Sequence, residues 1–308
     1  MNINEMYRDL TAIAGKNYVF QNEPMAGHTL TKMGGKADIL VQPASYQAAA
    51  DIIKYTVQHQ IPFMLLGNGS NMIVRDGGIR GIVMHLTHLS EIEVQGTSVV
   101  AQGGANIIDA SITAMDHCLT GFEFACGIPG SVGGAMVMNA GAYGGEIKDI
   151  IDYVRAIDAN GEIVTLTKDE LELSYRSSII LKKGYIVLEA VFQLEKGDAE
   201  TIRARVDDLT HQRETKQPLE YPSVGSVFKR PPGYFAGKLI QDSELQGQGV
   251  GGAEVSTKHA GFIVNKEDAT ATDYIETIEL VRRTVKEKFG VELELEAKIV
   301  GEEPKERK

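Results

Sequence analysis

The sequence lacks the features by which several protein classes are identified. It has only two cysteines, Cys118 and Cys126, and their spacing fits neither a Cys-x-x-Cys redox pair nor a metal-binding knuckle. No apolar run approaches the roughly 20 residues that are needed to cross a bilayer, and the first residues show no basic segment followed by an apolar one. We therefore expect reduced core thiols and a cytoplasmic protein without a membrane partner.

Positive charge is scarce as well. The formal net charge of −11 argues against a non-specific nucleic-acid binder and against a basic membrane-surface protein. An anionic ligand would therefore need a local basic pocket. One glycine-rich stretch could supply it with Lys229, Arg230, Lys238, Lys258 and His259, although any one of these residues by itself is more often a solvated surface residue.

Signals for metal binding and for serine hydrolysis are weak. His85 and His88 form a His-x-x-His pair at a predicted strand end, but no carboxylate pattern lies nearby, and we expect no metal. No Gly-x-Ser-x-Gly elbow is present. Ser226 follows Gly225, and its spacing alone indicates only a serine in a turn.

The length of 308 residues allows two or three domains. Apolar periodicity predicts helices over residues 45–59, 106–121, 198–217 and 273–288, and strands over residues 63–66, 81–86, 154–158, 162–166, 185–194 and 291–300. Hairpins are predicted at Gln95-Gly96 and Asn160-Gly161. The predicted inward residues of the helices are Ala49, Ile52, Ile53, Val57, Ile108, Ile112, Met115, Leu119, Ile202, Val206, Leu209, Ile278, Val281 and Val285.

Two glycine-rich loops are the most informative features of the chain. Residues 126–145 contain seven glycines in an otherwise apolar stretch, and residues 67–71 read Gly-Asn-Gly-Ser-Asn directly after an apolar run. Glycine permits positive φ and leaves no Cβ that would hold a ligand away from the backbone amides. Exposed amides in such turns bind anions. Two separate loops of this kind suggest a dinucleotide.

The alternative is that these glycines only make tight turns and bulges. Neither loop matches Gly-x-Gly-x-x-Gly after a first strand, with an acidic residue at the expected distance, or Gly-x-x-x-x-Gly-Lys-Ser/Thr. A Rossmann or P-loop site is therefore not indicated, and the nucleotide would have to be held in another way.

Eight segments, in order along nearly the whole chain, resemble the motifs of bacterial UDP-N-acetylenolpyruvoylglucosamine reductases (UDP-N-acetylmuramate dehydrogenases), in their shorter subtype. They are residues 28–38, 67–71, 127–131, 139–144, 174–177, 225–229, 236–240 and 259–265. Two positions depart from the family pattern. Lys36 replaces a proline in the first segment, and Leu295 replaces a proline in the closing Leu-Glu-Pro-Glu.

The resemblance implies an α+β fold: a vanillyl-alcohol-oxidase-type FAD-binding domain of two subdomains, followed by a C-terminal α/β substrate-binding domain. We expect the first subdomain over residues 1–90, the second over 91–197 and the substrate domain over 198–308. The implied cofactors are FAD and NADPH. The implied reaction reduces UDP-N-acetylglucosamine enolpyruvate to UDP-N-acetylmuramate for peptidoglycan, and we expect a monomer without nucleic acid.

The resemblance also assigns site residues. The catalytic residues would be Ser226 as proton donor, Arg176 and Glu296. Tyr175, Arg213, Lys229, Lys238 and His259 are the candidates for substrate binding. Residues that would hold FAD are Gly67, Asn68, Gly69, Ser70, Asn71, Gly127, Pro129, Gly130, Ser131, Gly133, Gly134, Asn139, Gly141 and Tyr143.

The implied chemistry explains these residue types. Hydride from N5 of the reduced flavin adds to C3 of the enolpyruvyl group, and negative charge collects at C2 and spreads into the attached carboxylate. Arg176 can hold that carboxylate in a planar fork. Ser226 can then protonate C2, because the carbanion is basic enough to accept a hydroxyl proton.

Several alternatives stay open at this point. Glu294 and Glu296 would point the same way in an extended strand, so register does not choose between them. Glu296 could orient the proton relay or supply a proton itself. Two rival functions are a flavoprotein oxidase of the same fold, which would not need Ser226, and a catalytically silent sensor of UDP-sugars.

Overall fold

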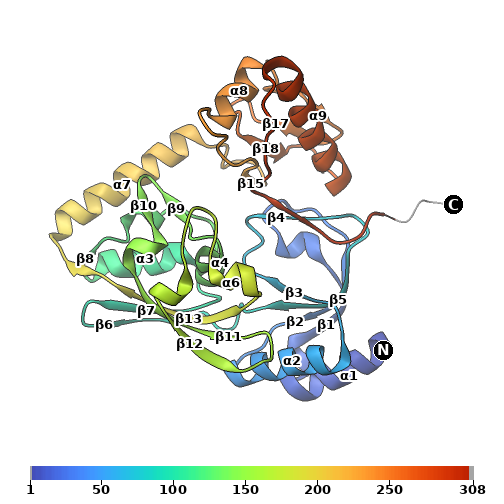
Figure 1. The fold of residues 1–308 in the computed structure, drawn as a ribbon, viewed down its shortest axis with the longest axis vertical. Coiled ribbons are helices and arrows are strands. Elements are labelled where there is room, and N and C mark those ends of the chain that lie inside the picture. The colour runs from blue at the N-terminus through green and yellow to red at the C-terminus, as the bar shows by residue number, and fades with distance from the viewer. Residues whose placement is uncertain (1, 305–308) are drawn as a thin grey trace. The chain divides into compact units, whose positions relative to one another are not determined.

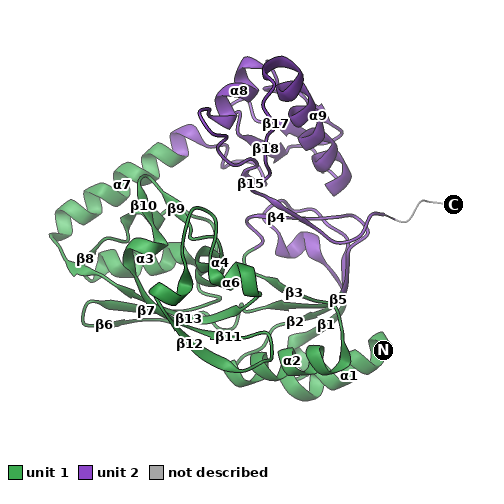
Figure 2. Ribbon diagram, in the orientation of Figure 1, with its two compact units in different colours: residues 1–21, 39–68, 81–213 green, residues 22–38, 69–80, 214–308 purple. Residues whose placement is uncertain are grey.

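The computed structural model describes residues 2–304, whose chain path is shown in Figure 1. These residues form two compact units, which Figure 2 distinguishes by colour. Of the described residues, unit 1 comprises 2–21, 39–68 and 81–213, and unit 2 comprises 22–38, 69–80 and 214–304. No helix among the described residues is both long enough and apolar enough to cross a membrane.

Unit 1 contains a five-stranded sheet, most of a four-stranded sheet, two two-stranded sheets and most of the α-helices. Its helices are α1 (Ile3–Ala14), α2 (Tyr46–His59), α3 (Ile107–Asp116), α4 (Val132–Val137), α5 (Ile147–Ile150), α6 (Ile179–Lys183) and most of α7 (Ala199–Lys216). Its strands are β3 (Phe63–Leu66), β6 (Ile92–Gln95), β7 (Ser98–Gln102), β8 (Leu119–Thr120), β9 (Gly141–Ala142), β10 (Gly145–Glu146), β11 (Ile151–Ile157), β12 (Ile163–Thr167), β13 (Ile186–Gln193) and β14 (Glu195–Lys196).

Unit 2 contains a four-stranded sheet, a two-stranded sheet and two complete α-helices. Its elements are β4 (Met72–Val74), β15 (Ser223–Ser226), α8 (Ala236–Asp242), β16 (Gly249–Val250), β17 (Ala253–Val255), β18 (Phe262–Asn265), α9 (Ala271–Phe289) and β19 (Lys298–Val300). Three further strands have residues in both units: β1 (Val19–Pro24), β2 (Lys36–Val41) and β5 (Ile79–His85).

The sheets and the helices that pack on them are held together by hydrophobic clusters. A four-stranded sheet has the order β1-β2-β5-β3, and a five-stranded sheet has the order β12-β11-β13-β7-β6. Helices α3, α4 and α6 pack on the five-stranded sheet, and α1 and α2 share a second cluster with β2, β5, β11 and β13. In unit 2, α8 and α9 pack on the sheet β15-β18-β17-β16.

Most predicted elements are confirmed. Ser45 caps α2 by accepting a hydrogen bond from the Ala48 N–H at 3.1 Å, as its residue type favours. The hairpin at Asn160-Gly161 joins β11 to β12, with Ile157 opposite Ile163. Gly290 ends α9 at φ 68°, a left-handed conformation that suits glycine.

Three details of the predictions are wrong. Val57 is 51% exposed, because the buried stripe of α2 passes through Thr56, whose hydroxyl bonds back to the Ile53 carbonyl. Helix α3 ends at Asp116, and Leu119 is buried in β8 instead. The final strand covers only Lys298–Val300, since the chain first bridges Phe228 through Leu295 and then changes partner to β4.

The predicted inward face of α3 packs against a helix that lies far along the chain. Ile112 and Met115 contact the cluster of Cys126, Val206 and Leu209, of which the last two belong to α7. The side of α3 that faces the five-stranded sheet carries Ile107, Ala110 and Ala114. Helix α3 is therefore buried on two sides, which single-face periodicity did not reveal.

The predicted division into three domains stays a prediction. Its second boundary, at residue 198, coincides with the start of α7, where Asp198 accepts hydrogen bonds from the N–H and hydroxyl of Thr201. The two compact units divide after Arg213, within the same helix.

Candidate functional site

The first glycine loop, residues 67–71, links β3 to β4. Gly69 has φ 62°, and a Cβ added there would overlap the carbonyl oxygen of His28, so only glycine fits. Within residues 2–304, the backbone N–H groups of Asn68, Gly69 and Ser70 donate to no protein acceptor. Unused donors in a turn are the feature that binds an anion.

In unit 1, the start of this loop meets the second glycine segment. A Cβ added to Gly67 would lie 2.7 Å from Oγ of Ser131, which is the N-cap of α4. The Asn68 side chain donates to Oδ1 of Asn106 at 2.6 Å, and Asn106 itself forms a bridge with Ser131. The structure therefore brings together two segments that the sequence marked separately.

The backbone around Ser131 is held rigidly. Its hydroxyl accepts a hydrogen bond from the Gly134 N–H at 3.1 Å, and the Gly133 N–H donates to the Gly103 carbonyl at 2.8 Å. A Cβ on Gly133 would lie 3.0 Å from that carbonyl oxygen. Residues 103–106 thus support the second loop, and sequence reasoning did not identify them; the Gly103-Gly104 pair was the available signal.

Asn139 is a predicted cofactor residue whose side chain is used within the protein. It is fully buried at φ 41°, and its amide donates to Oε2 of Glu146 at 2.9 Å and to the Ser174 carbonyl at 3.2 Å. Its Oδ1 accepts from the Lys148 N–H at 2.9 Å. Asn139 therefore shapes the loop, while Tyr143, at φ 53° and 40% exposed, is the more accessible residue of this segment.

These loops fit a dinucleotide cofactor. The unused amides of the first loop suit a diphosphate, and both loops contain glycines whose Cβ atoms would collide with neighbouring backbone or side chains. Gly141 is a further example, because its Cβ would lie 2.6 Å from the Gly145 carbonyl oxygen.

Tyr175 and Arg176 form the tip of a two-residue turn in unit 1. Ser174 and Ser177 exchange both of their N–H···O hydrogen bonds at 3.0 Å, and Arg176 has φ 53°. The guanidinium carbon of Arg176 lies 5.0 Å from the centre of the Tyr175 ring. Because Asn139 bonds to the Ser174 carbonyl, this turn is attached to the second glycine segment.

Arg213 lies against the same segment. A Cβ on Gly127 would be 2.8 Å from Cδ of Arg213, so the glycine makes room for the arginine. Burial lowers the pKa of Arg213, and the neighbouring Tyr143 and Cys126 oppose that shift. The structure thus places this predicted substrate residue beside the predicted cofactor segment.

In unit 2, the segment that carries Glu296 runs beside the strand of Ser226. Ser226 is exposed at the end of β15, and the Glu296 N–H donates to the carbonyl of the next residue, Val227, at 2.9 Å. The Asn71 side chain donates to the Glu296 carbonyl at 3.2 Å. The end of the first glycine loop therefore lies next to this segment.

The two glutamates have different surroundings. Residues 294–296 do not form a regular strand, and the carboxylate of Glu294 pairs with Lys229. Lys229 also donates its N–H to the Glu294 carbonyl at 2.8 Å. Glu294 is thus paired with a lysine, whereas the backbone of Glu296 is bonded next to Ser226.

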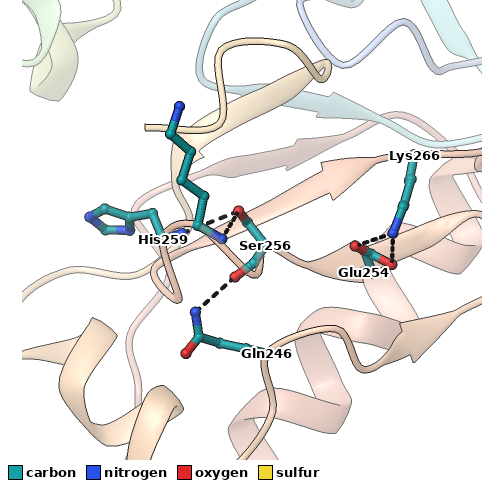
Figure 3. A network of polar contacts seen from close by, with 6 residues as sticks. Gln246, Glu254, Ser256, His259 and Lys266 are labelled. Carbon is teal, nitrogen blue, oxygen red and sulfur yellow. Dashed lines mark hydrogen bonds and ion pairs between the residues drawn. The ribbon is translucent and has the colours of Figure 1, made fainter. Parts of the chain in front are cut away.

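The remaining basic candidates have different surroundings. Lys238 pairs with Asp242 one turn along α8 at 2.5 Å, and its side chain is 66% exposed, as in an ordinary surface pair. Burial lowers the pKa of His259, whose Nδ1 accepts from the Gly261 N–H at 3.1 Å. Ser256 accepts hydrogen bonds from the backbone of Lys258 and His259, and Gln246 bonds to the Ser256 carbonyl (Figure 3).

No group of three or more histidine, cysteine, aspartate or glutamate side chains in the described part of the chain is arranged to hold a metal. His88 instead packs edge-on against Tyr18, with ring centres 5.0 Å apart.

Comparisons with known proteins find matches to two domain families along the chain. Residues 37–167 match a family model described as an FAD-binding domain, and residues 217–300 match the C-terminal domain of UDP-N-acetylenolpyruvoylglucosamine reductase. The predicted α+β fold class, with a vanillyl-alcohol-oxidase-type FAD-binding domain and a separate C-terminal domain, is confirmed.

Relatives match over nearly the full chain. A UDP-N-acetylenolpyruvoylglucosamine reductase of Geobacillus thermodenitrificans is 63% identical, covering 97% of this chain and 98% of its own. The protein of the same name from Geobacillus kaustophilus is 62% identical, covering 97% and 98%. The crystal structure of the reductase from Thermus caldophilus has a TM-score of 0.78 and 30% identity, covering 91% of this chain and 97% of its own.

Proposed function

Because the chain belongs to the family of UDP-N-acetylenolpyruvoylglucosamine reductases, we propose that it reduces UDP-N-acetylglucosamine enolpyruvate to UDP-N-acetylmuramate. The reaction would use FAD as cofactor and NADPH as hydride source, in the synthesis of peptidoglycan precursors in the cytoplasm. The observation that carries the proposal is the position of exposed Ser226 beside the segment of Glu296 in unit 2.

The two glycine loops would hold FAD. The amides of Asn68, Gly69 and Ser70, followed by Asn71, would bind the diphosphate together with Gly67 and residues 127–134. Gly141 and Tyr143 would lie near the flavin, and Asn139 would keep their loop in shape. When bound, FAD supplies the hydride-transfer chemistry between NADPH and the enolpyruvyl group.

Arg176 would bind the substrate carboxylate. Its guanidinium can form two parallel hydrogen bonds to a carboxylate, and these strengthen as negative charge spreads from C2 into that group. The tight turn between Ser174 and Ser177 limits the backbone freedom of Arg176, which reduces the ordering that binding requires.

Ser226 would donate its hydroxyl proton to C2. Its exposure at the end of β15 leaves the hydroxyl accessible to substrate. Glu296 would orient this proton transfer or return a proton to Ser226 after it, since its backbone is bonded next to Ser226.

The UDP diphosphate and sugar would be bound by Arg213, Lys229, Lys238 and His259, and Tyr175 is a further candidate for substrate binding. His259 would contribute as a neutral imidazole, because burial lowers its pKa. NADPH and the UDP-sugar would use the same flavin face in turn. Residues 1–197 would form the two cofactor subdomains and residues 198–308 the substrate domain of a monomer.

The proposal is tested by separating the half-reactions without oxygen. Purified protein with bound flavin is reduced by NADPH and then mixed with enolpyruvyl-UDP-N-acetylglucosamine, and the absorbance of oxidised flavin is followed. Prompt return of that absorbance supports the reductase. A flavin that stays reduced until air is admitted would support the oxidase alternative, and a protein that purifies without flavin would contradict the cofactor assignment.

A further inference from the structure

The strand that ends at Ser226 contains a β-bulge. Strand β15 pairs with β18 through Ser223 opposite Val264 and through Ser226 opposite Phe262. Between these two pairs, β15 has two residues, Val224 and Gly225, where β18 has only Ile263. Gly225 has φ 75°, which glycine adopts without strain and which is typical of one bulge type.

This extra residue decides which way Ser226 points. Side chains of a strand alternate between its two faces, so a shift of one residue moves every later side chain to the opposite face. Val224 is buried, and regular alternation would bury Ser226 as well. Instead Ser226 is exposed and Val227 is fully buried.

A buried tyrosine hydroxyl lies at the bulge. Tyr274 of α9 is fully buried, and its hydroxyl donates to the Ile263 carbonyl at 2.5 Å. The hydroxyl oxygen of Tyr274 also accepts a hydrogen bond from the Val224 N–H at 3.5 Å. Burial raises the pKa of Tyr274, so the hydroxyl keeps its proton and remains a donor. These are backbone groups of the residues opposed across the bulge, and the hydroxyl connects them.

We propose that Tyr274 is a positioning residue for the reaction: its hydroxyl stabilises the bulge at Val224-Gly225 and thereby presents Ser226 on the exposed face of β15. The inference rests on the proposed role of Ser226 as proton donor. Tyr274 acts through the backbone and not on substrate, so it should matter only for the step in which Ser226 takes part.

A matched control exists on the same helix. Thr277 is also fully buried, and its hydroxyl donates to the Asp273 carbonyl at 2.9 Å and accepts from the Val250 N–H at 3.0 Å. Thr277→Val therefore removes a buried hydroxyl that connects α9 to strand β16 instead of β15. Tyr274→Phe removes the hydroxyl at the bulge and keeps the aromatic ring in the core.

The experiment measures both half-reactions of the flavin-loaded protein by anaerobic stopped flow. In Tyr274→Phe, flavin reduction by NADPH should stay within about twofold of wild type, while reoxidation by the enolpyruvyl substrate slows by about 10- to 100-fold, as expected for a displaced catalytic group. Thr277→Val should leave both rates within about twofold. Reoxidation at the wild-type rate in Tyr274→Phe, with reoxidation lost in Ser226→Ala, would overturn the inference.

Two further readouts separate positioning from general loosening. In the Ser226→Ala background, adding Tyr274→Phe should slow reoxidation no further, because the group being positioned is absent. Hydrogen exchange, which needs no activity, should be faster for residues 223–228 in Tyr274→Phe than in Thr277→Val. Unchanged hydrogen exchange in Tyr274→Phe would overturn the inference. This result does not depend on whether Ser226 is the proton donor, which the turnover of Ser226→Ala tests separately.

A second variant covers the case in which Tyr274→Phe does not fold. Gly225→Ala strains the same bulge from the exposed side, and the added Cβ would have no atom within 4 Å to collide with. It should also slow reoxidation selectively. Equal slowing of both half-reactions by Gly225→Ala would contradict a role confined to Ser226.

Discussion

The glycine loops and the Ser226 strand use glycine for different purposes. In the loops, a Cβ at Gly69 would overlap the backbone of residues 28 and 29, and a Cβ at Gly67 or Gly127 would press on the side chain of Ser131 or Arg213. At Gly225 there is no such atom, and glycine is favoured only by its positive φ. Among the described residues, the first region has backbone amides without a protein acceptor, whereas the second exposes one hydroxyl. Substitutions should therefore affect cofactor retention in the first region and a single chemical step in the second.

The largest expected effect concerns the hydroxyl. Ser226→Ala should keep flavin reduction by NADPH and lower product formation by about 10²- to 10⁴-fold, because a general acid is removed. The two rates are measured separately by anaerobic stopped flow and product analysis. Near-normal turnover would show that Ser226 is not the donor and would remove the contrast between the two regions.

The next effect concerns the first glycine loop. Gly69→Ala should yield protein with little bound flavin, because the new Cβ overlaps the His28 carbonyl in addition to the strain of positive φ. Gly96→Ala is the matched control, with φ 66° and no atom within 4 Å of the Cβ. Flavin absorbance per protein should be unchanged in this control. Flavin content in Gly69→Ala equal to that of the control would show that the close contact at Gly69 is not needed to retain the cofactor.

A smaller effect, on stability, is expected at the contact between Asp76 and the start of α9 within unit 2. Asp76, which follows β4, accepts hydrogen bonds from the N–H groups of Ala271 and Thr272 and from the Thr272 hydroxyl at 2.6–3.0 Å. Asp76→Ala should lower the free energy of unfolding by about 1–2 kcal/mol, as the loss of a helix cap does. Chemical denaturation measures this, with the exposed Glu276→Ala on the same helix as control. If Asp76→Ala lowered the free energy of unfolding no more than Glu276→Ala does, Asp76 would not act as a stabilising cap of α9.

The smallest effect is a pH dependence. The pKa of His259 is lowered by burial, so the unfolded chain binds this proton more readily than the folded protein does. Stability should therefore fall as pH decreases from about 6.5, the ordinary histidine pKa, through the lower folded value. The thermal unfolding temperatures of wild type and His259→Gln, measured between pH 7.5 and about 5, should approach each other as the pH falls. Parallel curves would show that His259 is not buried as a neutral group.

Much of the fold followed from local patterns. Ser45, Asn160-Gly161 and Gly290 mark a helix start, a hairpin and a helix end by conformational preferences that act within a few residues. The errors arose where distant segments decided the outcome. Residues 291–300 changed partner from Phe228 to β4, and α3 acquired a second buried face from α7.

The candidate site divides in the same way. The sequence indicated both glycine loops, and by resemblance it indicated Ser226, Arg176 and Glu296. It did not show how Glu294 and Glu296 differ in their surroundings, because the ion pair between Glu294 and Lys229 and the irregular backbone of this segment are tertiary features. It also did not show that Asn139 uses both amide protons inside the protein.

The sequence by itself determined the family resemblance and the candidate residues for the chemistry, because residue type, glycine content and motif order are local properties of the chain. Only the tertiary structure decided how two of them are presented. Ser226 is exposed because β15 gains one residue against β18 and a hydroxyl from α9 lies at that point. Gly67 meets Ser131 because their loops, far apart in sequence, pack together in unit 1. Such pairings depend on which distant segments come into contact, and no local preference encodes that.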